Sequence, residues 1–405
     1  MADSDKAEPG RSPDPPDPPD PPDRDPATAQ RRRTAQLSWL LAGGGLAGVA
    51  VAFAIRPAEA TAAAAQDWSP FVLVAGLLMI GLVADGDGLF AAAGAQLATL
   101  TRSGWLLFGG AVALIAIVTA TLNLDTSVAF LTPVLVHTAR SRGAGEPALL
   151  YGCLLLSNAG SLLLPGSNLT NLIVLGQLHL TGGQFAATMW LPFLGALVVT
   201  AAVVAVGERR SLRPSADEPG GAEQPVLGVG LAAVIAATIL VVAIRDSALP
   251  VLAVGLVAVA VRLRSSRVTL GRIWAVLGVP VLAGLFGLAV ALGTLGRAWS
   301  GPSVLLSHLS GWATAGFAAV ATVLVNNLPA ASMLAARPVP HPFPLLLGLN
   351  LGPNLCVTGS LAWLLWLRSA RDAGASPSLT RASALGVVAV PLSLVVALAA
   401  LTVTS

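Results

Sequence analysis

Two stretches of sequence decide the fold: SNAGSLLLPGSNLTN at residues 157–171 and NLGPNLCVTGS at residues 350–360. Each places Asn, Ser, Thr, Gly and Pro inside a long apolar run typical of a membrane-spanning helix. Lipid cannot hydrogen-bond an exposed backbone, so a helix broken at membrane depth has to line a cavity walled by protein. Interrupted helices at corresponding places in two halves of a chain indicate the binding site of a secondary transporter.

Composition places the chain in a membrane. Of its 405 residues, 55% are hydrophobic and 11% are charged, whereas a soluble domain has about a quarter charged residues. We therefore expect an all-α polytopic protein of the cell inner (plasma) membrane, in contact with the lipid bilayer, and not an enzyme. The net charge is only +3, and the basic residues are mostly arginines between apolar runs, which gives no indication of nucleic-acid binding. The two cysteines lack metal-ligand spacing, and no cofactor, metal or catalytic group is expected.

The chain divides into four parts. Residues 1–35 are rich in Pro and Asp, cannot build a packed core, and predict a disordered cytoplasmic tail. Residues 36–206 and 226–405 predict a first and a second transmembrane repeat. The polar residues 207–225 between them predict a cytoplasmic linker.

Each repeat contains an interrupted stretch followed by a broken helix. The interrupted stretches are residues 105–136, broken by NLDT at 123–126, and residues 303–336, broken by NNLP at 326–329. In the first, neither arm comfortably reaches the roughly 20 residues that cross a bilayer, so we predict re-entrant helical hairpins. The broken helices are expected at 148–175 and 344–367, and a short helix at 89–100. Plain spans are expected at residues 36–55, 71–84, 184–206, 226–243, 248–261, 273–295 and 385–403.

The distribution of arginine orients these elements. With the N-terminus in the cytoplasm, cytoplasmic segments hold about four times as many arginines as exterior loops, which satisfies the positive-inside rule. The first hairpin then enters from the cytoplasm and the second from outside, as in an inverted-topology repeat. Two short crossing helices in place of the first hairpin would leave this bias unchanged.

Asp125 is the only acid that lies well inside an expected apolar stretch. A charge there costs at least about 2.5–3.5 kcal/mol, so we interpret it as a proton- or cation-binding carboxylate at a hairpin tip. A helix cap is the alternative, and Asn123 or Thr126 could share that role.

The tip of the second hairpin holds Asn326 and Asn327. Their neutral amides suit a polyhydroxyl solute or a cation, and the alternative is a capped turn before Pro329. No intramembrane Arg or Lys is expected near the broken helices, which weighs against a strongly anionic substrate, although helix termini could substitute. The candidate substrate- and ion-binding residues are Asn123, Asp125, Thr126, Ser157, Asn158, Ser167, Asn168, Thr170, Asn171, Asn326, Asn327, Asn350, Asn354, Thr358 and Ser360.

Four motifs carry a family resemblance: NLDTSVAFLTP at 123–133, SNLTN at 167–171, NNLPA at 326–330, and NLGPN at 350–354 with GSLA at 359–362. They resemble the ArsB-type arsenite permeases (arsenical pump membrane protein) of the ion-transporter superfamily. That superfamily also contains NhaD-type sodium/proton antiporters and sodium-coupled dicarboxylate carriers.

The resemblance implies two inverted repeats with the substrate site between hairpin tips and broken helices. It places Asp125 and Asn327 at the tips, and Asn168, Asn171 and Asn354 in the broken helices. It implies export of arsenite or antimonite in exchange for protons, alone or with an arsenical ATPase subunit, and a homodimer is included among the expected partners. Cys356 departs from the family pattern, and neither tip has the Ser-Asn-Thr triplet of dicarboxylate carriers, so that branch ranks lower.

The leading hypothesis is therefore a secondary active transporter that performs proton-coupled efflux of arsenite or antimonite. Arsenite near neutral pH is a neutral trihydroxide, which suits a site of amides and hydroxyls, and Asp125 would exchange the proton. The alternatives are a sodium/proton antiporter and a carrier of another small oxyanion or dicarboxylate on the same scaffold. A channel or a non-transporting membrane component is a further alternative, against which the two matched tips argue.

Overall fold

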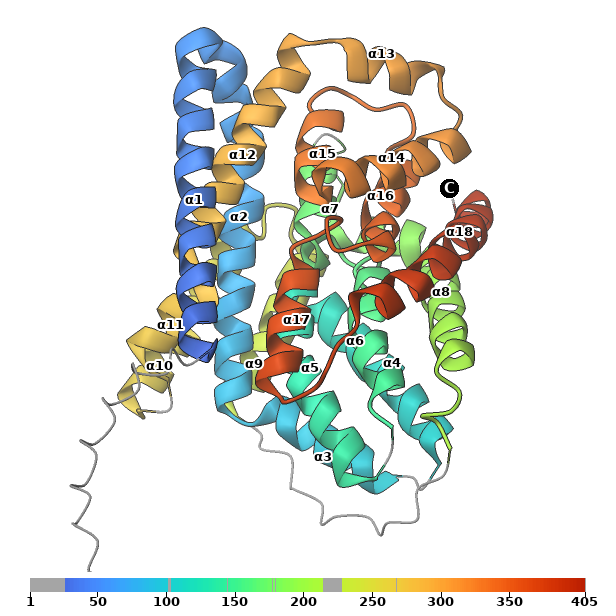
Figure 1. The fold of residues 1–405 in the computed structure, drawn as a ribbon. Helices are drawn as coiled ribbons and strands as arrows, with labels where there is room; N and C mark the ends of the chain where they lie inside the picture. The colour runs from blue at the N-terminus through green and yellow to red at the C-terminus, as the bar shows by residue number, and fades with distance from the viewer. Residues whose placement is uncertain are drawn as a thin grey trace, which may run out of the picture.

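The computed structural model describes residues 26–404, apart from residues 101–102, 144, 177, 179, 214–227 and 267. This part of the chain is helical, with eighteen α-helices and two short 3-10 helices and no β-strand (Figure 1). Six helical segments within it are long and apolar enough to cross a membrane: α1, α2, α4, α8, the α11–α12 segment and α18.

The helices of the first half follow the expected order. They are α1 (Pro26–Ile55), α2 (Pro57–Gly86), α3 (Leu89–Leu100), α4 (Gly104–Thr121), α5 (Leu124–Ser141), α6 (Pro147–Gly160), η1 (Pro165–Ser167), α7 (Leu169–Leu175) and α8 (Gly182–Gly207). Those of the second half are α9 (Val229–Ala243), α10 (Ala248–Arg264), α11 (Leu270–Leu277), α12 (Val279–Ala298), α13 (Gly301–His308), α14 (Gly311–Val325), α15 (Asn327–Leu334), α16 (Pro342–Leu351), η2 (Gly352–Leu355), α17 (Ala362–Asp372) and α18 (Leu379–Thr404).

Some boundaries differ from the sequence-based ones. Helix α1 begins at Pro26, so residues 26–35 of the expected disordered tail are helical, while residues 1–25 lie outside the described residues. Helix α2 begins at Pro57 instead of residue 71, because the alanine-rich stretch before Gln66 is a strong helix former of low hydrophobicity. Most of the expected linker, from residue 214 on, also lies outside the described residues.

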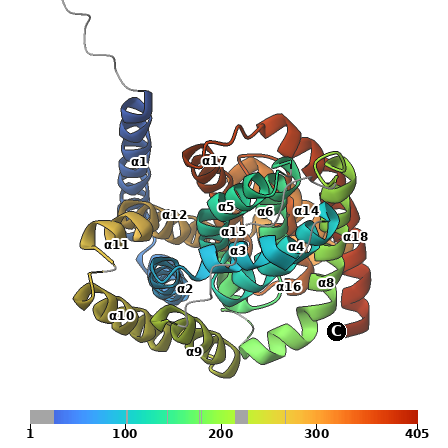
Figure 2. The same cartoon turned by 90° about the horizontal axis from the view of Figure 1, so that it is seen from below.

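The helices form two groups, seen side by side in Figure 2. Helices α1, α2, α9, α10, α11 and α12 form one group, which we call the scaffold, and helices α3 to α8 with α14 to α18 form the other, which we call the core domain. Small residues let scaffold helices approach closely: a Cβ on Gly45 of α1 would lie 2.2 Å from the carbonyl oxygen of Gly284 in α12. Such close contacts through glycine are typical of helix association in membranes.

The core domain contains the repeated elements. A hairpin (α4–α5) precedes a broken helix (α6–η1–α7) in the first half, and a hairpin (α14–α15) precedes a broken helix (α16–η2–α17) in the second. Figure 1 shows α4 and α5 in the lower part of the molecule and α14 and α15 in the upper part, as expected for inverted repeats. The two halves interlock, because α5 packs against α17 and α15 packs against α7.

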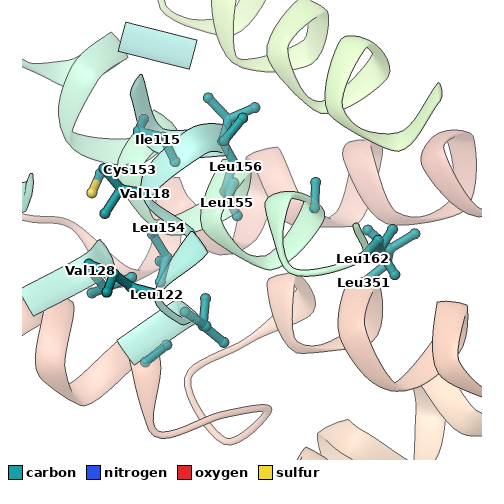
Figure 3. Close-up of a cluster of buried hydrophobic side chains, with 14 of the residues drawn as sticks. Ile115, Val118, Leu122, Val128, Cys153, Leu154, Leu155, Leu156, Leu162 and Leu351 are labelled. Carbon is teal, nitrogen blue, oxygen red and sulfur yellow. The ribbon is translucent and has the colours of Figure 1, made fainter. Parts of the chain in front are cut away.

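Apolar packing holds the first hairpin against its broken helix (Figure 3). Ile115 of α4, Val128 of α5 and Leu154 of α6 are fully buried in this cluster. Leu351, at the end of α16, belongs to the same cluster, so residues of both broken helices share one core. Full burial of each large aliphatic side chain contributes about 1.5–3 kcal/mol where its alternative is water.

Candidate functional site

Each broken helix is interrupted near a proline, which has no backbone N–H to donate to the helix. Helix α6 ends at Gly160, and the chain passes through η1, which begins at Pro165, before α7 starts. Helix α16 ends at Leu351 ahead of Pro353 in η2. Proline has no backbone N–H to continue a helix, so each break leaves carbonyl groups that need other donors.

Asn350 of α16 joins the two broken helices. Its Oδ1 accepts hydrogen bonds from Asn168 Nδ2 at 2.5 Å, Thr170 Oγ1 at 3.1 Å and Ser161 Oγ at 3.2 Å. Its Nδ2 donates to Asn171 Oδ1 at 2.7 Å and to the carbonyl oxygen of its own helix four residues back at 2.9 Å. All these side chains are buried. The amide of Asn350 is thus saturated by protein groups.

The carbonyl groups freed by the first break are also satisfied. Ser167 Oγ donates to the carbonyl oxygen of Ser161 at 2.5 Å, and Asn171 Nδ2 donates to the same oxygen at 2.7 Å. Asn171 Nδ2 also lies 3.3 Å from the carbonyl oxygen of Leu164. The unwound segment is therefore closed by its own polar side chains, as burial at membrane depth requires.

A second bridge joins α6 to η2. Asn158 Nδ2 donates to Asn354 Oδ1 at 2.8 Å, and Asn354 Nδ2 donates to the carbonyl oxygen of Leu155 at 3.0 Å. Asn158 is fully buried, yet its Oδ1 has no hydrogen-bond partner among the described residues. Helix α18 presses on this bridge, because a Cβ on Gly386 would lie 1.7 Å from the carbonyl oxygen of Asn354.

The tip of the first hairpin is only partly satisfied. Asn123 caps α5, with its Oδ1 accepting from the backbone N–H of Thr126 at 2.6 Å. Asn123 Nδ2 and Thr126 Oγ1 are buried and have no partner in the described part of the chain. Asp125 is half-buried, and none of the hydrogen bonds or ion pairs of the described residues involves its carboxylate. The tip packs against α2, where a Cβ on Gly81 would lie 2.5 Å from Thr126 Cγ2.

The tip of the second hairpin is tied to the second broken helix. Asn326 Nδ2 donates to the carbonyl oxygen of Thr358 at 3.1 Å. The backbone N–H of Asn327 donates to the carbonyl oxygen of Gly359 at 2.9 Å. Asn327 Oδ1 accepts from the backbone N–H of Leu328 at 2.9 Å, as expected of a capped turn. Asn326 has φ +77°, a conformation that costs of order 1–3 kcal/mol outside glycine and persists where surrounding contacts impose it.

The predicted residues thus fall into three clusters. Asn158, Asn168, Thr170, Asn171, Asn350 and Asn354 lie in the broken-helix bridges, with Ser167 in the turn between α6 and α7. Asn326, Asn327 and Thr358 lie at the second tip, and Asn123, Asp125 and Thr126 at the first. Ser157 bonds to Ser127 at 3.2 Å, and Ser360 Oγ is buried with no partner among the described residues.

Sequence reasoning missed two polar groups. Ser127, two residues after Asp125 in the first motif, joins α5 to α6 through Ser157. Asp67 lies outside the expected apolar stretches but inside α2 and is 2% exposed, so a second acid besides Asp125 is enclosed by the helices. Asp67 escaped notice because the alanine-rich residues before it look less apolar than the span that follows.

One cation lies closer to the broken helices than the sequence indicates. Arg297, in the last turn of α12, is half-buried and donates to Gln66 Oε1, and Gln66 Nε2 donates to the carbonyl oxygen of Ile173 in α7 at 2.9 Å. Arg297 therefore reaches the first broken helix through one intervening side chain.

The described residues contain no group of three or more His, Cys, Asp or Glu side chains that could hold a metal ion.

Inverted repeats, paired hairpins and polar breaks in apolar helices define a class: this is a multi-pass helical membrane protein of the secondary-transporter type, not an enzyme. Within that class, the chain belongs to the citrate transporter family (CitMHS), whose family model matches residues 37–352. The family assignment places it in the wider ion-transporter superfamily without singling out the arsenite branch.

Similar solved structures include the YdaH transporter of Alcanivorax borkumensis, described as having an unusual topology. It is 16% identical, the comparison covers 86% of this chain and 86% of that one, and the TM-score is 0.48. Among curated proteins, none matches this chain.

Proposed function

We propose that this protein is a proton-coupled carrier of a small oxygen-rich solute, a carboxylate or a related oxyanion. One observation carries the proposal: Asn123 Nδ2, Thr126 Oγ1, Asn158 Oδ1 and Ser360 Oγ are buried side-chain atoms with no partner in the described part of the chain. Folded proteins rarely leave buried polar groups unpaired, so the unpaired groups at the hairpin tip and helix breaks are the ones available to bind a solute.

The asparagine amides of the broken helices are not available to a solute. Asn350, Asn171 and Asn354 already use their donors and acceptors on protein atoms, so these residues hold the broken helices together instead of binding solute in this state. The binding role shifts towards the first tip and the orphaned groups of Asn158 and Ser360. The unpaired amide N–H of Asn123 and the two hydroxyls can donate to carboxylate or oxyanion oxygens.

Asp125 supplies the coupling. Its carboxylate lies between Asn123 and Thr126 in sequence and has no partner among the described residues, and an ionised carboxylate would repel an anionic solute. A proton on Asp125 removes that repulsion, so solute and proton enter the site together. The description of the family as citrate transporters supports a carboxylate as the solute. Sodium near Asp125 is the alternative coupling ion.

Efflux of arsenite or antimonite is the second candidate. It is favoured by the uncharged donor set, because no Arg or Lys of the described residues hydrogen-bonds to the orphaned groups and a neutral trihydroxide needs no counter-charge. In that case Asp125 would exchange its proton against the solute. Placement in the plasma membrane with a cytoplasmic N-terminus belongs to both proposals and rests on the arginine bias.

The test uses purified protein in proteoliposomes with an imposed pH gradient or sodium gradient. Uptake of labelled citrate or succinate that follows the pH gradient, and that Asp125→Asn abolishes, would support the carboxylate carrier. Arsenite accumulation by expressing cells, compared with empty cells, tests the second candidate. Asp372→Asn is the control, because Asp372 is exposed and lies 3.8 Å from its partner Arg368. Absence of solute movement in both assays would overturn both proposals.

A further inference from the structure

Gln66 of α2 ties two core helices to the scaffold. Its Nε2 donates to the carbonyl oxygen of Ile173 in α7 at 2.9 Å and lies 3.3 Å from that of Ala335, which follows α15. Its Oε1 accepts from the guanidinium of Arg297 on α12. One side chain therefore connects scaffold helices α2 and α12 to the ends of α7 and α15.

The equivalent helices of the other repeat are held differently. Helices α5 and α17 pack against each other as α15 and α7 do, and Arg140 of α5 donates to the carbonyl oxygens of Ala373 and Gly374 at 2.7 and 2.9 Å. These contacts stay within the core domain. In the α7–α15 pair, a polar side chain of the scaffold, Gln66, bonds to the helix ends. In the α5–α17 pair, the corresponding bonds come from Arg140 within the pair.

Asp67 lies next to this connection without taking part in it. The side chain is 2% exposed, and the described residues provide no hydrogen bond or ion pair to its carboxylate. Arg297 interacts with it electrostatically while bonding to Gln66 and to the carbonyl oxygen of Gly293 at 3.0 Å. An ionised carboxylate buried without a partner costs several kcal/mol, so a proton on Asp67 fits this arrangement.

Arg297 is the cation positioned to neutralise a negative charge on Asp67. It is the one charged residue of α12, and α3, α7, α9 and η1 carry none. Arg337 donates to the backbone oxygen of Arg297. Other charged or titratable groups lie on α2 or on elements packed against it. Six of them form the ion pairs Arg56–Glu59, Asp85–Arg272 and Asp87–Arg262. The rest are the exposed Arg245 and Asp246, then Asp125, His137, Arg140 and Arg264, and Arg31, Arg32 and Arg33 at the far end of α1.

We propose that Asp67 is a second proton-binding site, separate from the first hairpin tip, and that its proton decides whether Arg297 holds Gln66 or Asp67. With the proton on, Arg297 bonds to Gln66 and the scaffold holds α7 and α15, as observed. When the proton leaves to water, the carboxylate draws the guanidinium away from Gln66, and the polar link between the scaffold and the α7–α15 pair weakens. The inference does not depend on which solute is carried.

The test measures this attachment directly by pulsed electron paramagnetic resonance in lipid nanodiscs. Spin labels go on Ala54→Cys in α1 and Pro338→Cys beyond α15, both exposed positions, with Cys153 and Cys356 replaced by alanine. We expect one label–label distance in acidic buffer and a second population that grows as the pH rises. Asp67→Asn should keep the acidic distance at every pH, and Asp67→Glu should keep the pH response.

The matched control is Glu59→Gln, on the same helix, where the carboxylate is partly exposed and pairs with Arg56 at 3.7 Å. It should respond to pH like the wild type. A single distance population at every pH in the wild type, or an unchanged pH response in Asp67→Asn, would overturn the proposal. If Asp67→Asn unfolds, infrared difference spectroscopy of Asp67→Glu decides instead: a protonated carboxyl band that shifts from its wild-type position supports Asp67 as the site, and an unshifted band refutes it.

Discussion

The two hairpin tips occupy equivalent places in the inverted repeats but differ in how their polar groups are used. At the second tip, Asn326 and Asn327 bond to the backbone of Thr358 and Gly359 in the second broken helix. At the first, Asn123 Nδ2 and Thr126 Oγ1 have no partner among the described residues, and neither has the carboxylate of Asp125. A repeated element has therefore been specialised, with one tip closed on the protein and the other left with unused hydrogen-bonding capacity.

This difference refines the role of the interrupted helices. Their amides, centred on Asn350, are mostly occupied with one another, so the breaks supply rigidity around the site. We propose that the solute-binding capacity lies instead with the buried, unpaired polar groups of the first tip, Asn158 and Ser360. Substitutions at the first tip are therefore expected to change transport more than stability, and substitutions at the second tip to change stability more than transport.

The largest effect is expected from Asp125→Asn. The variant keeps the shape of the side chain but cannot carry a negative charge or exchange a proton, so stimulation of solute uptake by a pH gradient should disappear, a loss of about 5- to 150-fold for a typical coupling free energy. Thermal unfolding should change little, because the described structure has no bond to Asp125 to break. Uptake in proteoliposomes with and without the gradient is the measurement. Full stimulation in the variant would remove Asp125 from the coupling step.

The next effect concerns the second tip. Asn326→Ala should lower the free energy of unfolding by about 1–3 kcal/mol, because it removes the bond to Thr358 and places a Cβ-bearing residue with no side-chain polar group at φ +77°. Asn326→Gly should cost less, since glycine adopts this φ freely. Thermal unfolding in detergent separates the two variants. Equal destabilisation would show that the backbone conformation at this tip stores no strain.

Much of this architecture could be predicted from the sequence. Apolar length and the polar, Gly or Pro interruptions located both hairpins and both broken helices, because a bilayer allows few conformations for an interrupted helix. The partners of the polar residues could not be predicted. That Asn350 faces Asn168 and Asn171 is a consequence of how the two halves interlock, 182 and 179 residues apart in the chain.

The missed Asp67 shows a second limit. Its helix begins with an alanine-rich segment, and alanine is neutral enough to suit either a loop-side extension or a buried helix. The packing of α2 among α10, α12 and α9 decides that it is buried, and no local signal in the sequence reports this packing. Hydropathy therefore locates the centre of a span better than its ends, where buried charges are found.

The third prediction uses a residue that is buried and bonded. Ser127 Oγ lies 3.2 Å from Ser157 Oγ and is fully buried, so Ser127→Ala should lower the free energy of unfolding by about 0.5–1.5 kcal/mol. The apparent KM for solute should stay close to that of the wild type. Chemical denaturation and uptake kinetics on the same preparation give both numbers. A large rise in KM with unchanged stability would move Ser127 into the binding site.

Its neighbour Thr126 provides the smallest and sharpest comparison. Thr126→Val keeps the shape of the side chain and removes a buried hydroxyl that has no partner among the described residues, so stability should be unchanged or slightly higher. If that hydroxyl binds solute, the variant should raise the apparent KM by roughly 2- to 10-fold, the equivalent of one net hydrogen bond of about 0.5–1.5 kcal/mol. Ser127→Ala, one residue away on the same helix, controls for general disturbance of the tip. Ser127→Ala is expected to lower stability, and Thr126→Val to raise the apparent KM. If both variants lost stability, or both lost affinity for solute, the polar groups of the first tip would be no more available to solute than those of the second.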